Sequence, residues 1–248
     1  MALIGKMKHI IYILLRILIY RRGKEVTING QKLCFPIEYS RFYPEGYEIE
    51  KQKFIEEYCQ GVSLDLGSHI GLYTVIMSRL SKLVVSVEPS PNTRKALLNT
   101  ILLNNCSNVA IIGNAISASA GKATIFMTNN NVSNANSLFV SGKALEVDTI
   151  TIDSLGIDFN FIKIDIEGAE LLALQGAERV LKNVRAMTME IHPEILASIG
   201  QSRSEIWEIL ESHGGIIRHE GLKIRLQDFE QIRGPFEIQV LFPKRLTN

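Results

Sequence analysis

The sequence is poor in cysteine, in charge of one sign and in long apolar runs. Its three cysteines, Cys34, Cys59 and Cys106, show no C-x-x-C spacing, which argues against a disulfide framework and against a zinc site. A net charge of +1 produces no overall field toward nucleic acid, so we expect no nucleic-acid partner. No unbroken apolar run approaches the roughly 20 residues that span a bilayer. The scattered cysteines favour a reducing compartment, and we expect the protein to be cytoplasmic.

What is present is the composition of a compact α/β protein. Apolar side chains make up 46% of the 248 residues and charged ones 21%, enough for one large core. We divide the chain into residues 1–23, an amphipathic helix; 24–60, a hairpin followed by a lid or cap; and 61–248, a domain that carries the motifs described below.

The N-terminal segment mixes apolar and basic residues. Leu3 to Tyr20 is largely apolar, and its four basic side chains fall on one broad side of a helix: Lys6, Lys8, His9 and Arg16. This pattern is typical of an interfacial helix with a cationic face, and it predicts peripheral contact with the cytoplasmic face of a membrane through residues 3–22. Alternatively, the helix packs on the domain or on a second subunit, which would form a homo-oligomer.

Residues 24–60 contain three local signals. Asn29-Gly30 lies between two strand-like pieces, which predicts a hairpin. The aromatic segment from Tyr39 to Tyr47 is irregular, and Glu48 to Tyr58 has helical periodicity. The aromatic segment could form a lid over a ligand, although ordinary core anchors are the simpler explanation of its rings.

The most informative stretch is 62–71, VSLDLGSHIG, in which an apolar run reaches Asp65 and turns through Gly67 and Gly71. A second apolar run, 83–87, ends at Glu88. Two buried parallel strands have this pattern: the glycine-rich turn admits a ligand to the backbone, and a carboxylate at the second strand's end accepts both ribose hydroxyls. The combination predicts a cofactor that contains adenosine.

The glycine spacing distinguishes between cofactors. A dinucleotide site has G-x-G-x-x-G around the pyrophosphate, whereas this chain has D-x-G-x-x-x-G, with Asp65 at the first glycine position. A carboxylate there would repel a diphosphate but attract the ammonium and sulfonium of S-adenosylmethionine (SAM). SAM is therefore the predicted cofactor, and an NAD-dependent oxidoreductase is disfavoured.

The remaining sequence alternates between strand and helix patterns. Pro91 to Leu103 is predicted to be a helix, Val109 to Ile112 a strand, and Lys122 to Met127 an extra, antiparallel strand. The asparagine-rich stretch from Thr128 to Ser137 is a surface loop whose amides could hydrogen-bond a polyol. The predicted fold is α/β, a Rossmann-like doubly wound sheet that is mostly parallel with an antiparallel C-terminal strand.

Ionisable residues cluster where two later strands end. The segment 161–170, FIKIDIEGAE, places Lys163, Asp165 and Glu167 at the carboxyl end of a strand, before a helix predicted from Ala169 to Leu181. The strand from Ala186 brings Glu190 and His192 toward the same edge. Asp165 could position the cofactor or the molecule that accepts a group from it, and His192 or Glu167 could remove a proton from that molecule. Structural alternatives are an Asp165–Lys163 pair and a capping His192. No ligand spacing singles out a metal site, so we assign none.

Five segments resemble the FkbM family of SAM-dependent methyltransferases: 65–74 (DLGSHIGLYT), 87–90 (VEPS), 147–155 (VDTITIDSL), 162–170 (IKIDIEGAE) and 189–193 (MEIHP). The resemblance covers roughly Tyr47 to His192. It implies a class I methyltransferase sheet of seven strands and O-methylation of a hydroxyl on a sugar, glycan, lipid-linked glycan or secondary metabolite, so a small molecule or glycan is the expected partner.

The resemblance also implies roles for individual residues. The SAM loop corresponds to Asp65, Gly67, Ser68, His69 and Gly71, with His69 where the family usually has Asn; both tolerate positive φ. Glu88 corresponds to the ribose ligand, and Asp165 with Glu167 to the acidic motif. Glu48 would cap the cofactor, and Asn114 and Ala115 would meet the adenine. An alternative is a catalytically silent SAM-fold protein that binds a glycan or partner, but the intact Gly67, Gly71 and Glu88 argue against it.

Overall fold

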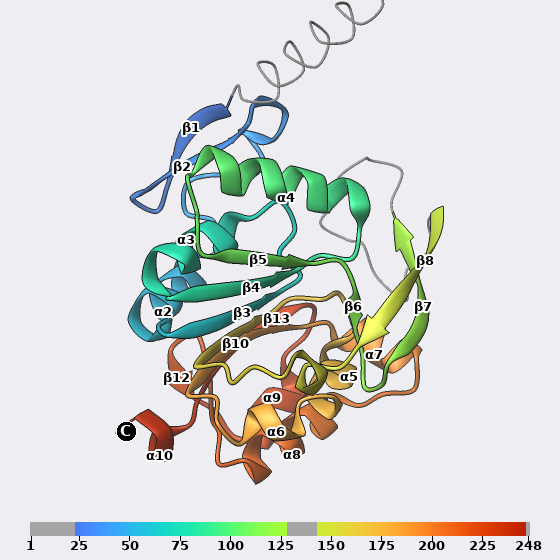
Figure 1. The fold of residues 1–248 in the computed structure, drawn as a ribbon. Helices are drawn as coiled ribbons and strands as arrows, with labels where there is room; N and C mark the ends of the chain where they lie inside the picture. Colours follow the sequence, from blue (N-terminus) through green and yellow to red (C-terminus); the bar gives the residue numbers. More distant parts are fainter. Residues whose placement is uncertain (1–22, 128–142, 247–248) are drawn as a thin grey trace, which may run out of the picture.

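The computed structural model describes residues 23–127 and 143–246. At its centre is a mixed sheet of eight strands with helices on both faces (Figure 1). The predictions for the N-terminal helix and for the asparagine-rich loop lie outside the described residues. Within the described part of the chain, no helix combines the length and the apolar character needed to cross a membrane.

Five parallel strands form the core of the sheet, as the alternating sequence pattern predicts. In spatial order the sheet contains β12 (Leu222–Lys223), β11 (Ile216–His219), β13 (Phe236–Leu241), β10 (Ala186–Ile191), β9 (Phe161–Ile164), β3 (Val62–Leu66), β4 (Leu83–Val87) and β5 (Val109–Ile112). Strand β13 pairs antiparallel with β10, which confirms the predicted antiparallel C-terminal strand.

The eighth strand is an addition to the expected seven. The two-residue β12 pairs with β11 through a tight turn at Glu220 and Gly221, whose φ angles of 49° and 77° are both positive. Such a turn matches the twist of antiparallel strands and extends the sheet edge by one short strand.

Chain order reverses between β3 and β9. From β3 the chain continues outward to β4 and β5, while β9 and β10 lie on the other side of β3. In open α/β sheets a ligand binds at the carboxyl ends of the strands where the order reverses. The paired ends of β3 and β9, with Asp65 opposite Lys163 and Leu66 opposite Ile164, mark this place.

Two apolar layers hold the helices on the sheet. Helices α2 (Ile49–Tyr58), α3 (Leu72–Leu80) and α4 (Pro91–Leu103) lie on one side, and α5 (Glu170–Gln175), α6 (Glu178–Leu181), α8 (Arg203–Ser212) and α9 (Leu226–Gln231) on the other (Figure 1). Phe54, Ile76 and Phe161 belong to the first layer, and Leu174 and Leu210 to the second. Helix α4 and strand β5 have the predicted bounds.

The helix predicted from Ala169 to Leu181 is in fact two helices, and that prediction is wrong at Gly176. A Cβ at Gly176 would lie 2.6 Å from the carbonyl oxygen of Ser117, so the chain packs closely against a neighbouring segment there. The Asp153 carboxylate then accepts hydrogen bonds from the backbone of Arg179 and Val180 and so caps the new helix. Tertiary contacts, rather than local propensity, break the helix.

Smaller elements surround the main sheet. The hairpin predicted around Asn29-Gly30 is confirmed as β1 (Gly23–Ile28) and β2 (Gln31–Pro36). A three-stranded sheet contains β6 (Ala115–Ile116), β8 (Lys143–Ile150) and β7 (Gly121–Met127), and β7 is antiparallel to β8 as predicted. The short helices are η1 (Ile37–Tyr39), η2 (Asp153–Leu155), α7 (Pro193–Ser198) and α10 (Pro243–Leu246).

Candidate active site

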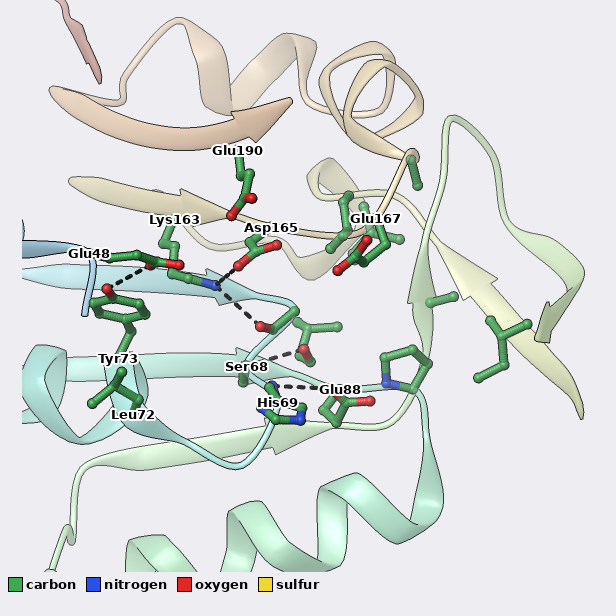
Figure 2. Close-up of a pocket in the computed structure, with 18 of the residues that line it drawn as sticks. Glu48, Ser68, His69, Leu72, Tyr73, Glu88, Lys163, Asp165, Glu167 and Glu190 are labelled. Atoms are coloured by element: carbon green, nitrogen blue, oxygen red, sulfur yellow. Dashed lines mark hydrogen bonds and ion pairs between the residues drawn. The ribbon is translucent and has the colours of Figure 1, made fainter. Parts of the chain in front are cut away.

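A cavity of about 260 Å³ opens at the carboxyl ends of β3, β4, β9 and β10. The turn after β3 and the end of β4 form one wall, the ends of β9 and β10 form the opposite wall, and the segment before α2 closes the cavity. Figure 2 shows Asp165, Glu167 and Glu190 across from Ser68, His69 and Glu88. The cavity therefore combines the glycine-rich turn and the acidic strand ends that the sequence predicts as a site.

The turn after β3 is tight because glycine allows its backbone to touch the end of β9. Gly67 has φ of 72°, and a Cβ there would lie 1.7 Å from the carbonyl oxygen of Asp165. His69 adopts φ of 51°, as predicted for a residue that tolerates positive φ. The Ser68 hydroxyl donates to the carbonyl oxygen of Asp65 at 2.8 Å. The turn therefore presents backbone and small side chains to the cavity.

Glu88 is a buried carboxylate held by two backbone donors. Its Oε2 accepts from the His69 amide at 3.1 Å and its Oε1 from the Ser90 amide at 2.9 Å, and the side chain lines the cavity. It forms no ion pair with any described residue, and burial raises its pKa to about 7. A carboxylate oxygen has more than one lone pair, so Glu88 can still accept hydrogen bonds from a diol. This fits the ribose of SAM.

Asp65 lies beneath the cavity rather than in its wall. Its side chain is fully buried, its Oδ1 is 3.3 Å from Lys163 Nζ, and its Oδ2 accepts from the Thr74 hydroxyl. The expectation that its carboxylate faces the ligand is therefore corrected: a buried lysine neutralises the charge. Lys163 also donates to the carbonyl oxygen of Gly67 at 3.2 Å, so the pair supports the turn from below.

Lys163 also holds Asp165. The Nζ atom lies 3.6 Å from Asp165 Oδ2. Burial alone would raise the pKa of Asp165, but the cations Lys163 and Lys51 outweigh it and lower that pKa. Burial lowers the pKa of Lys163, and Asp65 and Asp165 reverse this into a net rise. Asp165 therefore lines the cavity as an anion at neutral pH.

A chain of carboxylates surrounds His192. The ring Nδ1 is 2.9 Å from Glu170 Oε1, and Nε2 is 3.3 Å from Glu167 Oε2 and 4.0 Å from Glu190 Oε1. Burial lowers the pKa of His192, but the hydrogen bond and charge of Glu170 and the charge of Glu167 outweigh it and raise that pKa to about 9. Burial raises the pKa of Glu167 to about 7, which His192 limits.

The buried amine of Lys51 links the segment before α2 to the sheet. Its Nζ lies 2.6 Å from Glu48 Oε2, 3.3 Å from Glu190 Oε2 and 2.9 Å from Glu237 Oε2. Glu48 also accepts from the Tyr73 hydroxyl at 2.8 Å (Figure 2). Sequence reasoning missed Lys51. The available signal is that Lys51 shares a helical face with the apolar Phe54 and Ile55, where a lysine requires partners.

Aromatic side chains from the predicted lid close the cavity beside the glycine-rich turn. Tyr43 and Tyr47 line it, and the Tyr43 hydroxyl and His69 Nδ1 are 2.8 Å apart. Burial lowers the pKa of His69 to about 4, so its ring is neutral at pH 7. His69 Nε2 is buried and has no hydrogen-bond partner among the described residues, which leaves one polar atom of this wall for a ligand.

The structure brings most, but not all, of the predicted site residues to the cavity. Those that line it are Glu48, Gly67, Ser68, His69, Glu88, Ala115, Asp165 and Glu167. Gly71 directly precedes α3, and a Cβ there would meet Leu97, so its role is packing. Asn114 borders a separate depression with Arg94. His192 reaches the cavity wall through Glu167.

Comparison with known proteins agrees with this arrangement. The family described as Methyltransferase FkbM domain matches residues 65–217, more than half of the chain. No curated protein matches the chain.

Similar solved structures include an rRNA methylase from Streptococcus thermophilus, with 10% identity, a TM-score of 0.45 and coverage of 79% of this chain and 95% of that one. Another is precorrin-6y C5,15-methyltransferase from Geobacter metallireducens GS-15, with 12% identity, a TM-score of 0.47 and coverage of 81% and 90%. At these values neither structure informs the reaction of this chain. On the family match, the chain belongs to the FkbM family of SAM-dependent methyltransferases.

Proposed function

We propose that this chain methylates a hydroxyl oxygen of a sugar, glycan, lipid-linked glycan or secondary metabolite. The proposal depends on the position and the pKa of Glu167. This carboxylate lies in the cavity wall, its pKa is raised to about 7, and its Oε2 is 3.3 Å from Nε2 of His192. A hydroxyl must lose its proton as it is methylated, and a base with a pKa near the working pH is suited to accept that proton.

The cofactor half of the cavity fits SAM. When bound, SAM would supply a methyl group from its sulfonium: the acceptor oxygen would form a bond to the methyl carbon as the carbon–sulfur bond breaks, with the electron pair of that bond left on sulfur. Glu88 would accept hydrogen bonds from the ribose hydroxyls. The anion of Asp165 favours a cationic ligand nearby, and the backbone of Gly67 and Ser68 allows close approach.

The different pKa values of Glu167 and His192 indicate different roles for the two side chains. His192, with a pKa of about 9, carries a proton at neutral pH and so cannot remove one. Glu167, with a pKa of about 7, is partly ionised there and lies in the cavity wall. We therefore assign proton removal to Glu167, with the His192 cation stabilising its ionised form.

The proposed acceptor class is tested with [methyl-¹³C]SAM and fractionated glycans, lipids and small metabolites. The expected product carries an O–CH₃ group, identified by NMR and mass spectrometry. Glu167→Gln should lose at least tenfold in turnover while it still binds SAM. Glu178→Gln, at an exposed carboxylate, is the matched control. A methyl group found on nitrogen or carbon would refute O-methylation.

We also propose peripheral membrane contact through residues 3–22, which suits a lipid-linked acceptor. The support is the sequence pattern: an apolar stripe interrupted by basic residues on one side. Each Lys or Arg near an anionic surface contributes about 1 kcal/mol of binding.

A further inference from the structure

Three side chains at the acidic end of the cavity form a potential ligand set for a cation. One oxygen each of Asp165 and Glu167 and one ring nitrogen of His192 all lie within 4.8 Å of one another. They come from the end of β9, the turn after it and the end of β10. Small inward movements would bring all three to the distance of about 2 Å at which such atoms bind divalent metals. We call these three residues the triad.

His192 has the outer contact that metal-binding histidines usually have. Its Nδ1 lies 2.9 Å from Oε1 of Glu170, a fully buried carboxylate that also accepts from the Gly168 amide at 2.8 Å. This contact fixes the ring and turns Nε2 toward Glu167. A ligating histidine almost always donates its other N–H to a carboxylate, carbonyl or water. The geometry therefore sets His192 up as a ligand through Nε2, and binding of a cation would displace the proton that His192 carries in the metal-free protein.

Among the described residues, the carboxylates in and around the triad outnumber the cationic side chains that contact them. The second oxygen of Glu170, Oε2, is buried without a hydrogen-bond partner among the described residues. Lys51 contacts three carboxylates outside the triad, Glu48, Glu190 and Glu237, and Lys163 is shared between Asp65 and the triad's own Asp165. A half-satisfied buried carboxylate beside a histidine and further acids is favourable when a cation is close by.

We propose that the triad binds one divalent cation of the Mg²⁺ or Mn²⁺ type, whose open positions hold two neighbouring oxygens of the acceptor. This rests on the proposed O-methylation and narrows its substrate class to vicinal diols and α-hydroxy carbonyl compounds. The cation lowers the pKa of a hydroxyl that it holds. Each carboxylate needs to contribute only one oxygen, so the second oxygen of Glu167 remains to accept the hydroxyl proton.

Binding of Mn²⁺ alone tests the site without any acceptor. Untagged full-length protein, freed of metal with a chelator, is titrated with Mn²⁺ while EPR measures the free ion. We expect one ion per chain, with affinity at least tenfold weaker in Glu167→Gln and in His192→Asn. Glu170→Gln should weaken binding about ten- to hundredfold, because Glu170 orients a ligand without being one.

A surface pair supplies the matched control. His213 Nε2 lies 3.3 Å from Glu178, the same separation as in the His192–Glu167 pair, but Glu178 is exposed. His213→Asn should leave Mn²⁺ affinity unchanged. Melting temperature and SAM affinity show whether each variant is folded. Glu167→Gln is the variant expected to fold most readily, because 21% of the Glu167 side chain is exposed.

Three results would overturn the proposal: no Mn²⁺ bound, Mn²⁺ bound equally by Glu167→Gln, or an equal loss in His213→Asn. Failure of the cation site can be told from failure of O-methylation. If methyl transfer to oxygen continues in excess chelator, the role of the cation is refuted and O-methylation is retained. If Mn²⁺ binds tightly but the methyl group is transferred to nitrogen, O-methylation is refuted and the cation site is retained.

Discussion

Replacing Glu88 with glutamine should weaken SAM binding and, at the same time, stabilise the free protein at alkaline pH. The Glu88 carboxylate is buried and has no ion pair among the described residues. Its role in binding and its cost to the free protein have the same origin, a charge kept away from water. If Glu88 binds the ribose, its replacement should lower SAM affinity and raise thermal stability at alkaline pH. If Glu88 only supports the fold, its replacement should leave SAM affinity unchanged and lower thermal stability.

The binding effect follows from the hydrogen bonds that glutamine cannot replace. Two backbone amides orient the carboxylate, and hydrogen bonds from the ribose to a charged acceptor contribute about 1.5–3 kcal/mol. The SAM dissociation constant should therefore rise about ten- to hundredfold in Glu88→Gln. In wild type it should also rise as pH falls below about 7, because protonation removes the acceptor, whereas the variant should lack this pH dependence.

The stability effect has the opposite sign. Folding raises the pKa of Glu88 from 4.5 to about 7, so the folded state holds a proton more tightly than the unfolded state. Folding stability therefore falls as pH rises from about 4.5 to about 7, by roughly 3 kcal/mol at most. Glutamine avoids this loss but gives up one backbone hydrogen bond, worth about 1 kcal/mol. We expect Glu88→Gln to melt several degrees higher than wild type at pH 8, with little difference at pH 5.

Calorimetric titration with SAM at pH 6 and pH 8, and thermal unfolding of the free protein at pH 5 and pH 8, make both measurements. Unchanged SAM affinity in Glu88→Gln would refute the assignment of the ribose site. A variant that is less stable than wild type by the same amount at both pH values would refute the electrostatic argument.

Three further predictions concern the rest of the site. Asp165→Asn should keep the melting temperature within a few degrees while turnover falls at least tenfold; a variant that does not fold would instead indicate a structural pair with Lys163. Turnover should rise with pH through about 7 as Glu167 ionises, and a flat profile through that pH would exclude its role as the base. Vesicles with anionic lipid should sediment the full chain but not a chain that begins at Lys24, and equal sedimentation of both would exclude contact through residues 3–22.

Elements with strong local signals could be predicted from the sequence. The helix Pro91–Leu103 begins with proline at its first position, and the adjacent strand Val109–Ile112 is rich in β-branched residues; the structure confirms both with the same bounds. The break at Gly176 could not be predicted, because it depends on contacts with Ser117 and Asp153, which are distant in the sequence.

The same distinction applies to the site. Gly67 and Glu88 belong to a compact motif whose spacing predicts SAM binding, and both line the cavity. Lys51 was missed because its partners Glu190 and Glu237 follow it by well over a hundred residues. The burial of Asp65 against Lys163 was also missed, since the strand pattern shows that a residue is buried but not which charge it meets.

The position of Lys51 limits how far the catalytic region can be treated as a portable module. Of its three carboxylate partners, Glu190 lies within the family-matched residues 65–217, whereas Glu48 and Glu237 lie on either side of them. A chimera that transplants residues 65–217 alone would leave Glu190 beside the cavity without its buried cation. Substitutions around α2 can conversely reshape one wall of the cavity while the family's own motifs stay untouched, a route by which relatives with the same core could diverge in acceptor.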